Sequence, residues 1–330
     1  MLSGQVSDIA SYILLGYQSL QTMDYPAMNK KVLITGGTGL VGKRLTEILI
    51  SQGCEVSYLS RSKKKLAGVS VFKWDIKKNF IEEGALENID CIIHLAGAGV
   101  AERRWSKEYK DVIRDSRVNS SELLLQALKS SGNKVKTFIS ASAIGIYGFD
   151  TGSGIVSEES EYGTDFLAHV TREWEEKVDQ VVDLNKRLVK LRIGMVLSKD
   201  GGALSKMIGP AKLGLGAGFG SGKQYLSWIH IDDLCAMFIK AIESDDLHGS
   251  YNAVAPSPIT NYEFAKTLSK VLRRPFFAPN VPGFLLKIVL GEMANLVLGG
   301  SKVSSKKIES MGFQFKFRDL ENAIIDLLKK

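Results

Sequence analysis

The sequence predicts an α/β fold, a Rossmann-type doubly wound parallel sheet with a smaller C-terminal substrate lobe. Short β-rich runs alternate with longer helical runs from residue 31 to residue 193. The first β-rich run breaks into glycines before a helical pattern begins, and after Arg192 the alternation gives way to a Gly-rich loop and Pro-interrupted helical segments. Alternation of this kind is typical of parallel strands whose connecting helices cover both faces of the sheet.

The expected elements follow in chain order. Each predicted strand is a short run of apolar or β-branched residues, and each predicted helix has apolar residues at helical spacing. Helices are predicted near 40–52, 106–130 and 165–183, and strands at 31–35, 54–60, 70–73, 90–95, 135–141 and 187–193. The chain has 330 residues, of which 45% are hydrophobic, so it is long enough to bury a core of this size.

Three segments are expected along the chain. Residues 28–200 form a nucleotide-binding Rossmann domain, and residues 201–330 form the substrate lobe, with about 228–254 returning a helix and a strand to the main sheet. Because Met28 directly precedes the first strand, we expect residues 1–27 to be an N-terminal extension outside the fold. The smaller lobe should lean over the carboxyl ends of the strands, where folds of this class bind their ligands.

The first strand-to-helix junction has the pattern of a phosphate-binding turn. Gly36 lets the chain turn sharply off the strand, Gly39 removes a Cβ that would hold a diphosphate away, and Gly42 lets the helix pack closely. The amides around Gly39, Leu40 and Val41 begin a helix whose positive end faces the phosphates. The alternative is an ordinary turn, but the strand before the motif and the apolar stripe after it favour a dinucleotide site.

The residues after the second strand favour NADP over NAD. An acidic residue at this position binds the ribose 2′-hydroxyl of NAD and would repel a 2′-phosphate. This chain has Arg61 and Ser62 there, followed by lysines at 63–65. A guanidinium and a hydroxyl can bind the 2′-phosphate through charge-assisted hydrogen bonds. The alternative interpretation is a solvated basic loop.

Two further strand ends supply candidate cofactor contacts. Asp75 follows the third strand and is placed to approach the adenine side, with capping of the next segment as the alternative. Ala96 and Gly97 follow the next long apolar run, and their small size leaves room for a ligand over the strand end. His94 lies inside that apolar run, so we expect a packed histidine and not a catalytic one.

Charge and cysteine patterns argue against several other classes of protein. The net charge of +7 comes from lysines scattered along the chain without a basic helical stripe, which argues against nucleic acid as a partner. The three cysteines fit neither a disulfide framework nor the spacing of a metal site, so no metal is expected. Cys54 and Cys91 lie in strand-like runs, and we expect buried, reduced thiols in a cytoplasmic protein.

Hydropathy argues against a membrane partner. No stretch has about 18 uninterrupted apolar residues, the length that a spanning helix needs. The most apolar candidate, 284–298, is broken by Lys287 and Glu292. We therefore expect a partly buried helix in that segment.

A set of short motifs spans the chain from about Met28 to the C-terminus. Those at 35–42, 94–97, 117–119, 140–148 and 228–233 resemble the motifs of the extended short-chain dehydrogenase/reductase superfamily. Those at 174–175, 191–197, 214–222, 252–256 and 312–313 resemble more closely its atypical branch, the SDR39U1-like epimerase family, often labelled nucleoside-diphosphate-sugar epimerases. The resemblance implies a Rossmann-type fold that binds NADP (NADPH), with Arg117 and Asn119 approaching the cofactor.

The resemblance also implies a site for proton exchange, which this chain only partly matches. Active superfamily members use a Tyr-x-x-x-Lys pair beside a serine that holds the reacting oxygen. Ser142 matches the serine, but the expected helix over 165–177 contains no such pair. Tyr147 and His169 are the candidates to act near Ser142. The alternatives are a backbone hydrogen bond for Ser142 and a place beside an apolar stripe for His169.

Two features of the C-terminal lobe complete the candidates. The Gly-rich loop 209–222 carries Lys212, which suits an anionic substrate such as a sugar diphosphate, and a mobile loop with no ligand is the alternative. Tyr262 and Lys266 have the spacing of the missing pair, but they lie far from the serine strand in the sequence, so we expect no catalytic role for them.

The sequence therefore predicts an NADP-binding, epimerase-like or reductase-like protein. Its substrate is expected to be a small anionic or carbonyl compound such as a nucleotide sugar. The alternative is a catalytically impaired, NADPH-binding regulatory or scaffold module, because the usual proton relay is missing. The expected partner is a small molecule and neither nucleic acid nor a membrane, and a homodimer is compatible with this class.

Overall fold

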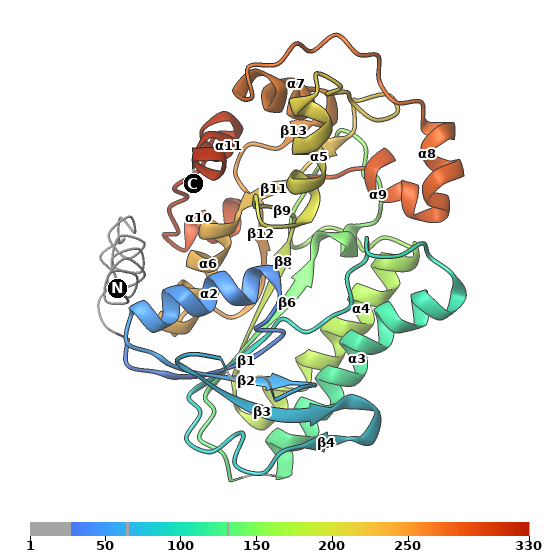
Figure 1. The fold of residues 1–330 in the computed structure, drawn as a ribbon. Helices are drawn as coiled ribbons and strands as arrows, with labels where there is room; N and C mark the ends of the chain where they lie inside the picture. The colour runs from blue at the N-terminus through green and yellow to red at the C-terminus, as the bar shows by residue number, and fades with distance from the viewer. Residues whose placement is uncertain (1–27, 64–65, 131, 330) are drawn as a thin grey trace, which may run out of the picture.

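The protein contains a large twisted sheet between two layers of helices (Figure 1). The computed structural model describes residues 28–63, 66–130 and 132–329. The predicted extension over 1–27, and Lys64 and Lys65 of the predicted basic loop, lie outside the described residues. Within the described chain, eight strands form one sheet in the order β12-β8-β6-β5-β1-β2-β3-β4.

Neighbouring strands of this sheet pair in parallel, except β3 and β4, which are antiparallel. This confirms the predicted Rossmann-type α/β fold. The strands are β1 (Lys31–Thr35), β2 (Glu55–Ser60), β3 (Val69–Asp75), β4 (Phe80–Ile81), β5 (Cys91–His94), β6 (Thr137–Ala143), β8 (Arg187–Ile193) and β12 (Gly249–Ala253).

The strand order reverses its direction between β1 and β5. From β1 the chain adds β2, β3 and β4 toward one edge, and then β5, β6, β8 and β12 toward the other. Helices α2 (Leu40–Ser51) and α6 (Ile231–Glu243) pack together on one face, and α3 (Lys107–Ser130) and α4 (Phe166–Asp179) on the other (Figure 1). Because the helices part at this reversal, ligands of doubly wound folds bind there.

The core lies in the central strands and in the helix stripes that face them. Val32, Leu33 and Ile34 of β1 are fully buried, as expected for a strand covered on both faces. Leu45 and Leu49 of α2 pack in the same core. Cys54, Cys91 and Cys235 are all buried as free thiols, which confirms the expected burial of the first two.

The C-terminal lobe lies over the carboxyl ends of the strands (Figure 1). Its helices are α5 (Gly202–Lys212), α7 (Asn261–Val271), α8 (Gly283–Leu290), α9 (Asn295–Leu298), α10 (Lys306–Ser310) and α11 (Leu320–Lys329). Three short pairs of strands complete it: β10 (Tyr225–Leu226) with β13 (Ile259–Thr260), β11 (Trp228–His230) with β9 (Met195–Leu197), and β14 (Lys302–Val303) with β7 (Ile155–Val156). Single 3₁₀ turns lie at η1 (Ile76–Lys78), η2 (Ile144–Tyr147), η3 (Val182–Leu184) and η4 (Gly291–Ala294).

The segment 284–298 differs from its prediction. It forms α8, η4 and α9 instead of one helix. Partial burial is found at Leu286 and Leu290 and over most of η4 and α9, whereas the outer side chains of α8 are more exposed than expected: Phe284, Ile288 and Val289 are 64%, 67% and 69% exposed. Helix α8 is eight residues long and packs mainly on η4, so its outer side chains have no cover within the described chain.

Candidate nucleotide site and the adjoining polar network

The turn between β1 and α2 leaves no room for a side chain at Gly36, Gly37 or Gly42, and a Cβ on Gly37 would clash with the ring of Tyr58. Gly36 has a φ of +71°, and a Cβ there would lie 2.8 Å from the carbonyl carbon of Leu95. A Cβ on Gly42 would lie 2.5 Å from the carbonyl oxygen of Gly36. The turn is closed by the Gly39 amide, which donates to the Gly36 carbonyl at 2.9 Å. These contacts bring the start of α2 against the end of β5.

Gly39 lies in a different environment, because its side-chain position is open. A Cβ there would meet only the Gly36 carbonyl oxygen, at 3.2 Å. Gly39 is exposed and caps α2 without a side-chain hydrogen bond, and the first turn of the helix contains no acidic residue. The first-turn amides of Leu40 and Val41 have no acceptor inside the helix. Together these groups form an electropositive recess that fits a diphosphate.

Ala96 and Gly97 form the other side of this recess. The hydroxyl oxygen of Thr35 accepts hydrogen bonds from the amides of Leu95 and Ala96, both at 3.2 Å, which holds the chain after β5 against β1. Ala96 is half-buried and Gly97 is exposed. The small residues thus leave the strand end accessible, as the sequence predicts.

Arg117 of α3 places a cation beneath this strand end. Its guanidinium would lie 3.2 Å from a Cβ on Gly97, and it stacks over the ring of Trp174 with 5.5 Å between the guanidinium carbon and the ring centre. It donates to the Ile113 carbonyl at 2.8 Å, and no acidic side chain of the described chain pairs with it. Burial lowers the pKa of Arg117 from 12.5 to about 10, so the group stays charged at neutral pH and favours a nearby anion.

The predicted residues at the ends of β2 and β3 are near the surface. Arg61 and Ser62 are exposed directly after β2, and Lys63 pairs with Glu82 at 2.6 Å. Asp75 caps η1, because one of its carboxylate oxygens accepts from the amides of Lys77 and Lys78 at 3.0 and 3.2 Å. Capping of η1, the alternative expected for Asp75, is thus present in the structure.

His94 is a packed histidine, which confirms its prediction. It is fully buried, with Nδ1 at 2.7 Å from the Thr35 hydroxyl and Nε2 at 3.1 Å from that of Ser121. Burial, with a smaller contribution from the charge of Arg117, lowers the pKa of His94 from 6.5 to about 3. The ring is therefore neutral at physiological pH and orients Thr35, whose hydroxyl holds the chain after β5.

This burial makes the stability of the protein pH-dependent. The unfolded chain takes up a proton at His94 below about pH 6.5, whereas the folded protein does so only near pH 3. The contribution of neutral His94 to the free energy of unfolding is therefore complete above pH 6.5. It is lost as the pH falls below this value, by about 1.4 kcal/mol per pH unit. We expect His94→Gln to be less stable at pH 7 but to lose less stability between pH 6.5 and 4.5, as measured by urea unfolding. Equal pH slopes for the two proteins would contradict this assignment.

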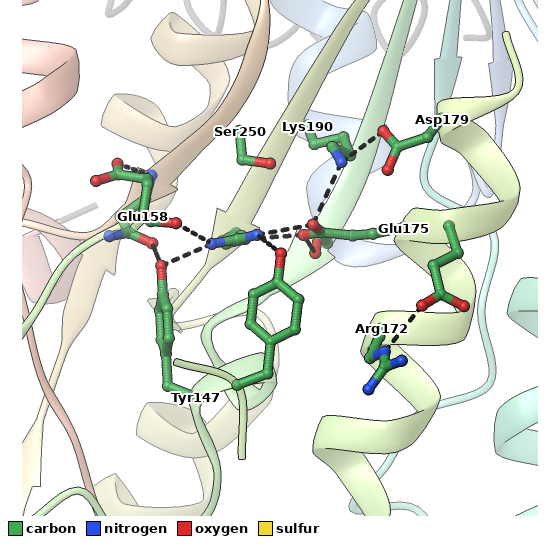
Figure 2. A network of polar contacts seen from close by, with 12 residues as sticks. Tyr147, Glu158, Arg172, Glu175, Asp179, Lys190 and Ser250 are labelled. Atoms are coloured by element: carbon green, nitrogen blue, oxygen red, sulfur yellow. Dashed lines mark hydrogen bonds and ion pairs between the residues drawn. The ribbon is translucent and has the colours of Figure 1, made fainter. Parts of the chain in front are cut away.

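Ser142 belongs to a buried charge network on the α4 face of the sheet. Figure 2 shows Tyr147, Glu175 and Lys190 of this network. The guanidinium of Arg192, on β8, donates to both carboxylate oxygens of Glu175, on α4, at 2.9 and 2.8 Å. The Ser142 hydroxyl donates to the same carboxylate at 2.5 Å. Lys190 lies 3.4 Å from Glu175 and 2.6 Å from Asp179. Arg192 therefore pairs with an acid.

Tyr147 belongs to the same network and links it to the C-terminal lobe. Its hydroxyl accepts from Arg192 at 3.0 Å and donates to the side-chain carbonyl of Asn252, on β12, at 2.7 Å. The Asn252 amide group in turn donates to the Ser304 carbonyl, and its backbone amide to Glu158. Burial is the main cause that raises the pKa of Tyr147. The hydroxyl is thus protonated at neutral pH and has partners within the protein.

The network keeps Glu175 ionised. Burial alone would raise the pKa of Glu175, but the hydrogen bonds and charge of Arg192, the charge of Lys190 and the hydroxyl of Ser142 lower it below the usual 4.5. A carboxylate held in this way is a weak base at neutral pH. Glu175 therefore positions Ser142 and does not replace the missing tyrosine and lysine as a proton acceptor.

The remaining candidates are not brought to this network. His169 is exposed on α4, whereas Ser142 is 4% exposed beneath the same helix. Tyr262 is exposed on α7 in the C-terminal lobe, where its ring packs on Phe276. The structure therefore unites Ser142 with Tyr147 and leaves the imidazole of His169 apart from both.

The sequence does not predict several members of this network, although it contains one signal for them. Glu175, Asn252 and Glu158 were not expected to act together, because isolated polar residues carry no pattern of their own. Glu175 lies in the 174–175 motif on the buried side of an amphipathic helix. A carboxylate on that side requires a cationic partner, and Arg192 in an apolar strand has the matching requirement.

The Gly-rich loop of the C-terminal lobe is held by polar contacts. The Phe219 amide donates to Asn261 at 2.6 Å, and the Gln224 side chain donates to the carbonyls of Phe219 and Val297. Phe219 also forms a bridge with Val281. Lys212, at the end of α5, is exposed.

Comparison with known proteins places these features in a family. The model of the NAD dependent epimerase/dehydratase family matches residues 32–254, which include the glycine-rich turn between β1 and α2 and the network around Glu175. The chain belongs to this family. A second model, a domain of unknown function (DUF1731), matches residues 281–327 in the C-terminal lobe.

Individual relatives extend over nearly the whole chain. The epimerase family protein YfhF of Bacillus subtilis is 35% identical over 90% of this chain and 97% of its own length. The crystal structure of human epimerase family protein SDR39U1 with NADPH has a TM-score of 0.81 and 31% identity, and covers 91% of this chain and 99% of that one. A nucleoside-diphosphate sugar epimerase from Corynebacterium glutamicum has a TM-score of 0.74 and 33% identity, over 98% of this chain and 63% of that one. These relatives confirm the family resemblance predicted from the motifs.

Proposed function

We propose that this epimerase-family chain binds NADPH in the recess at the carboxyl ends of β1 and β5. The open position at Gly39 carries the proposal, because a diphosphate can approach the first-turn amides of Leu40 and Val41 there. The cation of Arg117, which no acid of the described chain neutralises, adds favourable charge beside it. The NADPH named in the structure of the human relative supports the same cofactor.

The two ends of the cofactor would contact different strand ends. Arg61 and Ser62 would bind the 2′-phosphate, since both are exposed after β2 and neither is acidic. Asp75, after β3, would approach the adenine side with the carboxylate oxygen that does not cap η1. The path toward the nicotinamide would be lined by Ala96, Gly97 and Arg117. The nicotinamide supplies or accepts the hydride when the cofactor is bound.

We propose further that the chain acts as an epimerase or reductase on a small anionic or carbonyl substrate such as a nucleotide sugar. The name of the bacterial sugar-nucleotide relative supports this class. Ser142 would accept a hydrogen bond from a hydroxyl group of the substrate, because its own proton is donated to Glu175. Tyr147 would support this site through Arg192, and His169 has no place in it. The buried thiols agree with a cytoplasmic location.

A second candidate function is NADPH binding without turnover. It is favoured by the internal partners of Ser142 and Tyr147 and by the lack of a Tyr-x-x-x-Lys pair on α4. Such a module would respond to the cofactor as a regulator or scaffold. A homodimer stays a prediction for either function, and light scattering of the purified protein checks it.

One experiment distinguishes the two functions. The purified protein is titrated with NADPH, and its complex is then offered carbonyl compounds and sugar nucleotides while absorbance and epimer content are followed. Turnover that falls in Ser142→Ala supports the enzyme, because Ser142 would contact the reacting oxygen. Saturable binding with no turnover of any compound supports the module. Failure to bind either NADPH or NADH would contradict both.

We expect Arg61 to set the preference between the two nucleotides. Arg61→Gln removes the charge-assisted bonds to a 2′-phosphate, so the Kd for NADPH should rise about tenfold while the Kd for NADH changes little. Fluorescence titration with both nucleotides measures this ratio. Lys63→Gln is the matched control, because Lys63 already pairs with Glu82. An equal loss for NADPH and NADH in Arg61→Gln would overturn the assignment.

A further inference from the structure

The outer edge of the C-terminal lobe exposes an unusual number of large apolar side chains. We define the α8 edge by seven exposed apolar side chains on residues 213–215 and 277–289: Leu213, Leu215, Phe277, Phe284, Leu285, Ile288 and Val289. Leu213 and Phe277 are 77% and 78% exposed. A contiguous exposed apolar patch on a folded protein marks an interaction surface more often than scattered apolar residues do.

The residues of the α8 edge lie on two chain segments that pack together. A Cβ on Gly214, between Leu213 and Leu215, would lie 3.6 Å from the ring of Pro275. The Val281 amide donates to the Gly218 carbonyl at 2.8 Å, just before α8. Figure 1 shows the segment after α7 passing over the top of the lobe to α8, which lies at the margin of the molecule. The edge therefore lies on the outside of the C-terminal lobe.

The charges on this edge are of one sign. Residues 201–231 and 273–291 contain no aspartate or glutamate. They contain Lys206, Lys212, Lys223, Arg273, Arg274 and Lys287, and none of these forms an ion pair within the described chain. The apolar side chains are thus accompanied in these two segments by cations that form no ion pair within the described chain.

This combination favours an anionic lipid surface over a second copy of the chain. A symmetric dimer through the edge would place the same cations opposite one another, which like-charge repulsion opposes. Acidic lipid headgroups attract the cations, and the acyl boundary accepts exposed apolar side chains without a matching groove. We propose that the α8 edge docks the protein on an anionic membrane surface.

This inference revises one expectation from the sequence. The sequence predicts no membrane partner because no segment is long enough to span, and no described helix of the structure is long and apolar enough to cross a membrane. Docking requires only that an amphipathic surface lie in the interface. The inference is independent of the proposed cofactor, since the edge is built from α8 and the segments before it and not from the β1–α2 turn.

Vesicle binding by the full chain tests the proposal. The probes are vesicles of phosphatidylcholine alone and of phosphatidylcholine with about one third phosphatidylserine, and bound protein is measured by co-sedimentation. We expect binding to the anionic vesicles, at least about tenfold weaker binding for Phe284→Ser/Ile288→Ser, and about fivefold weaker binding for Lys287→Gln. Val182→Ser is the matched control, because Val182 is a 55% exposed apolar residue in η3, outside the lobe.

Circular dichroism and NADPH titration establish that each variant is folded, so a loss of vesicle binding is not a loss of structure. Unchanged binding of Phe284→Ser/Ile288→Ser to anionic vesicles would overturn the proposal. Absence of vesicle binding by the unmodified protein would also overturn it. An edge-dependent dimer in light scattering would then indicate a second copy of the chain as the occupant. Edge-dependent binding to polyglutamate, a probe for an acidic protein, would indicate a protein partner. Loss of NADPH binding with retained vesicle binding would count only against the proposed cofactor site.

Discussion

Replacing Gly39 by aspartate is expected to weaken NADPH binding about 100-fold while the protein stays folded. The side chain would point into the open recess, where a carboxylate opposes the cofactor diphosphate. At an effective dielectric constant near 20, two unit charges about 4 Å apart repel by about 4 kcal/mol, so a 100-fold loss, about 2.7 kcal/mol, is within reach. The fold should persist because aspartate is a favoured N-cap residue and Gly39 has a φ of −75°.

Two further substitutions separate charge from shape and binding from folding. Gly39→Asn has nearly the same shape without the charge, so the Kd for NADPH should rise much less than in Gly39→Asp. Gly42→Ala should instead lower the melting temperature, because its Cβ would lie 2.6 Å from the Cα of Gly37. Titration by fluorescence and thermal unfolding measure the two effects. If Gly39→Asp bound NADPH as well as the native protein, the recess would not be the diphosphate site.

The features that the sequence predicts well are those whose signal is local. The strand at 31–35 is recognisable because four consecutive residues are buried on both faces, and the helix after it because Leu45 and Leu49 repeat at helical spacing. The signal of the glycine-rich turn between β1 and α2 is also local, since the geometry of the turn comes from a few consecutive residues. Each of these features is therefore encoded within a short window.

The features that escaped prediction depend on residues far apart in the chain. The partners of Arg192 are Glu175, 17 residues before it, and Tyr147, 45 residues before it. Nothing in the local pattern of α4 or β8 shows that these side chains meet, although each is unusual in a buried position. For α8, the apolar composition predicts burial, and only the tertiary arrangement shows that its outer face is exposed.

The network also changes the interpretation of Ser142. The family resemblance implies that a serine at this position holds a reacting oxygen. In the structure the Ser142 hydroxyl donates its hydrogen bond to Glu175 instead. The same contact that limits its chemistry fixes its orientation, since Glu175 is itself held by two bonds from Arg192. Stability and any catalytic use of Ser142 are thus linked through one carboxylate.

Arg192→Met is accordingly expected to destabilise the protein strongly. It would leave the carboxylate of Glu175 buried without its bidentate partner, and breaking a buried pair in this way typically costs 3–5 kcal/mol. For a chain of this length we expect the melting temperature to fall by about 4–7 °C. Arg172→Met is the matched control. Arg172 pairs with Glu176 on the exposed side of α4, the helix that carries Glu175 (Figure 2), so its loss should change stability little.

A double variant and a pH series identify the cause of this loss. Glu175→Leu with Arg192→Met removes both charges, so it should be more stable than Arg192→Met alone even though it contains one more substitution. The pKa of Glu175 is lowered in the folded protein, so its contribution is complete above the unfolded value of 4.5 and declines as the pH falls below it. The double variant should lose less stability than the native protein below pH 4.5. The opposite result would be a double variant whose loss of unfolding free energy equals the sum of the two single losses and whose stability depends on pH as in the native protein. Arg192 would then act through packing alone, and the ion pair with Glu175 would not hold α4 against the sheet.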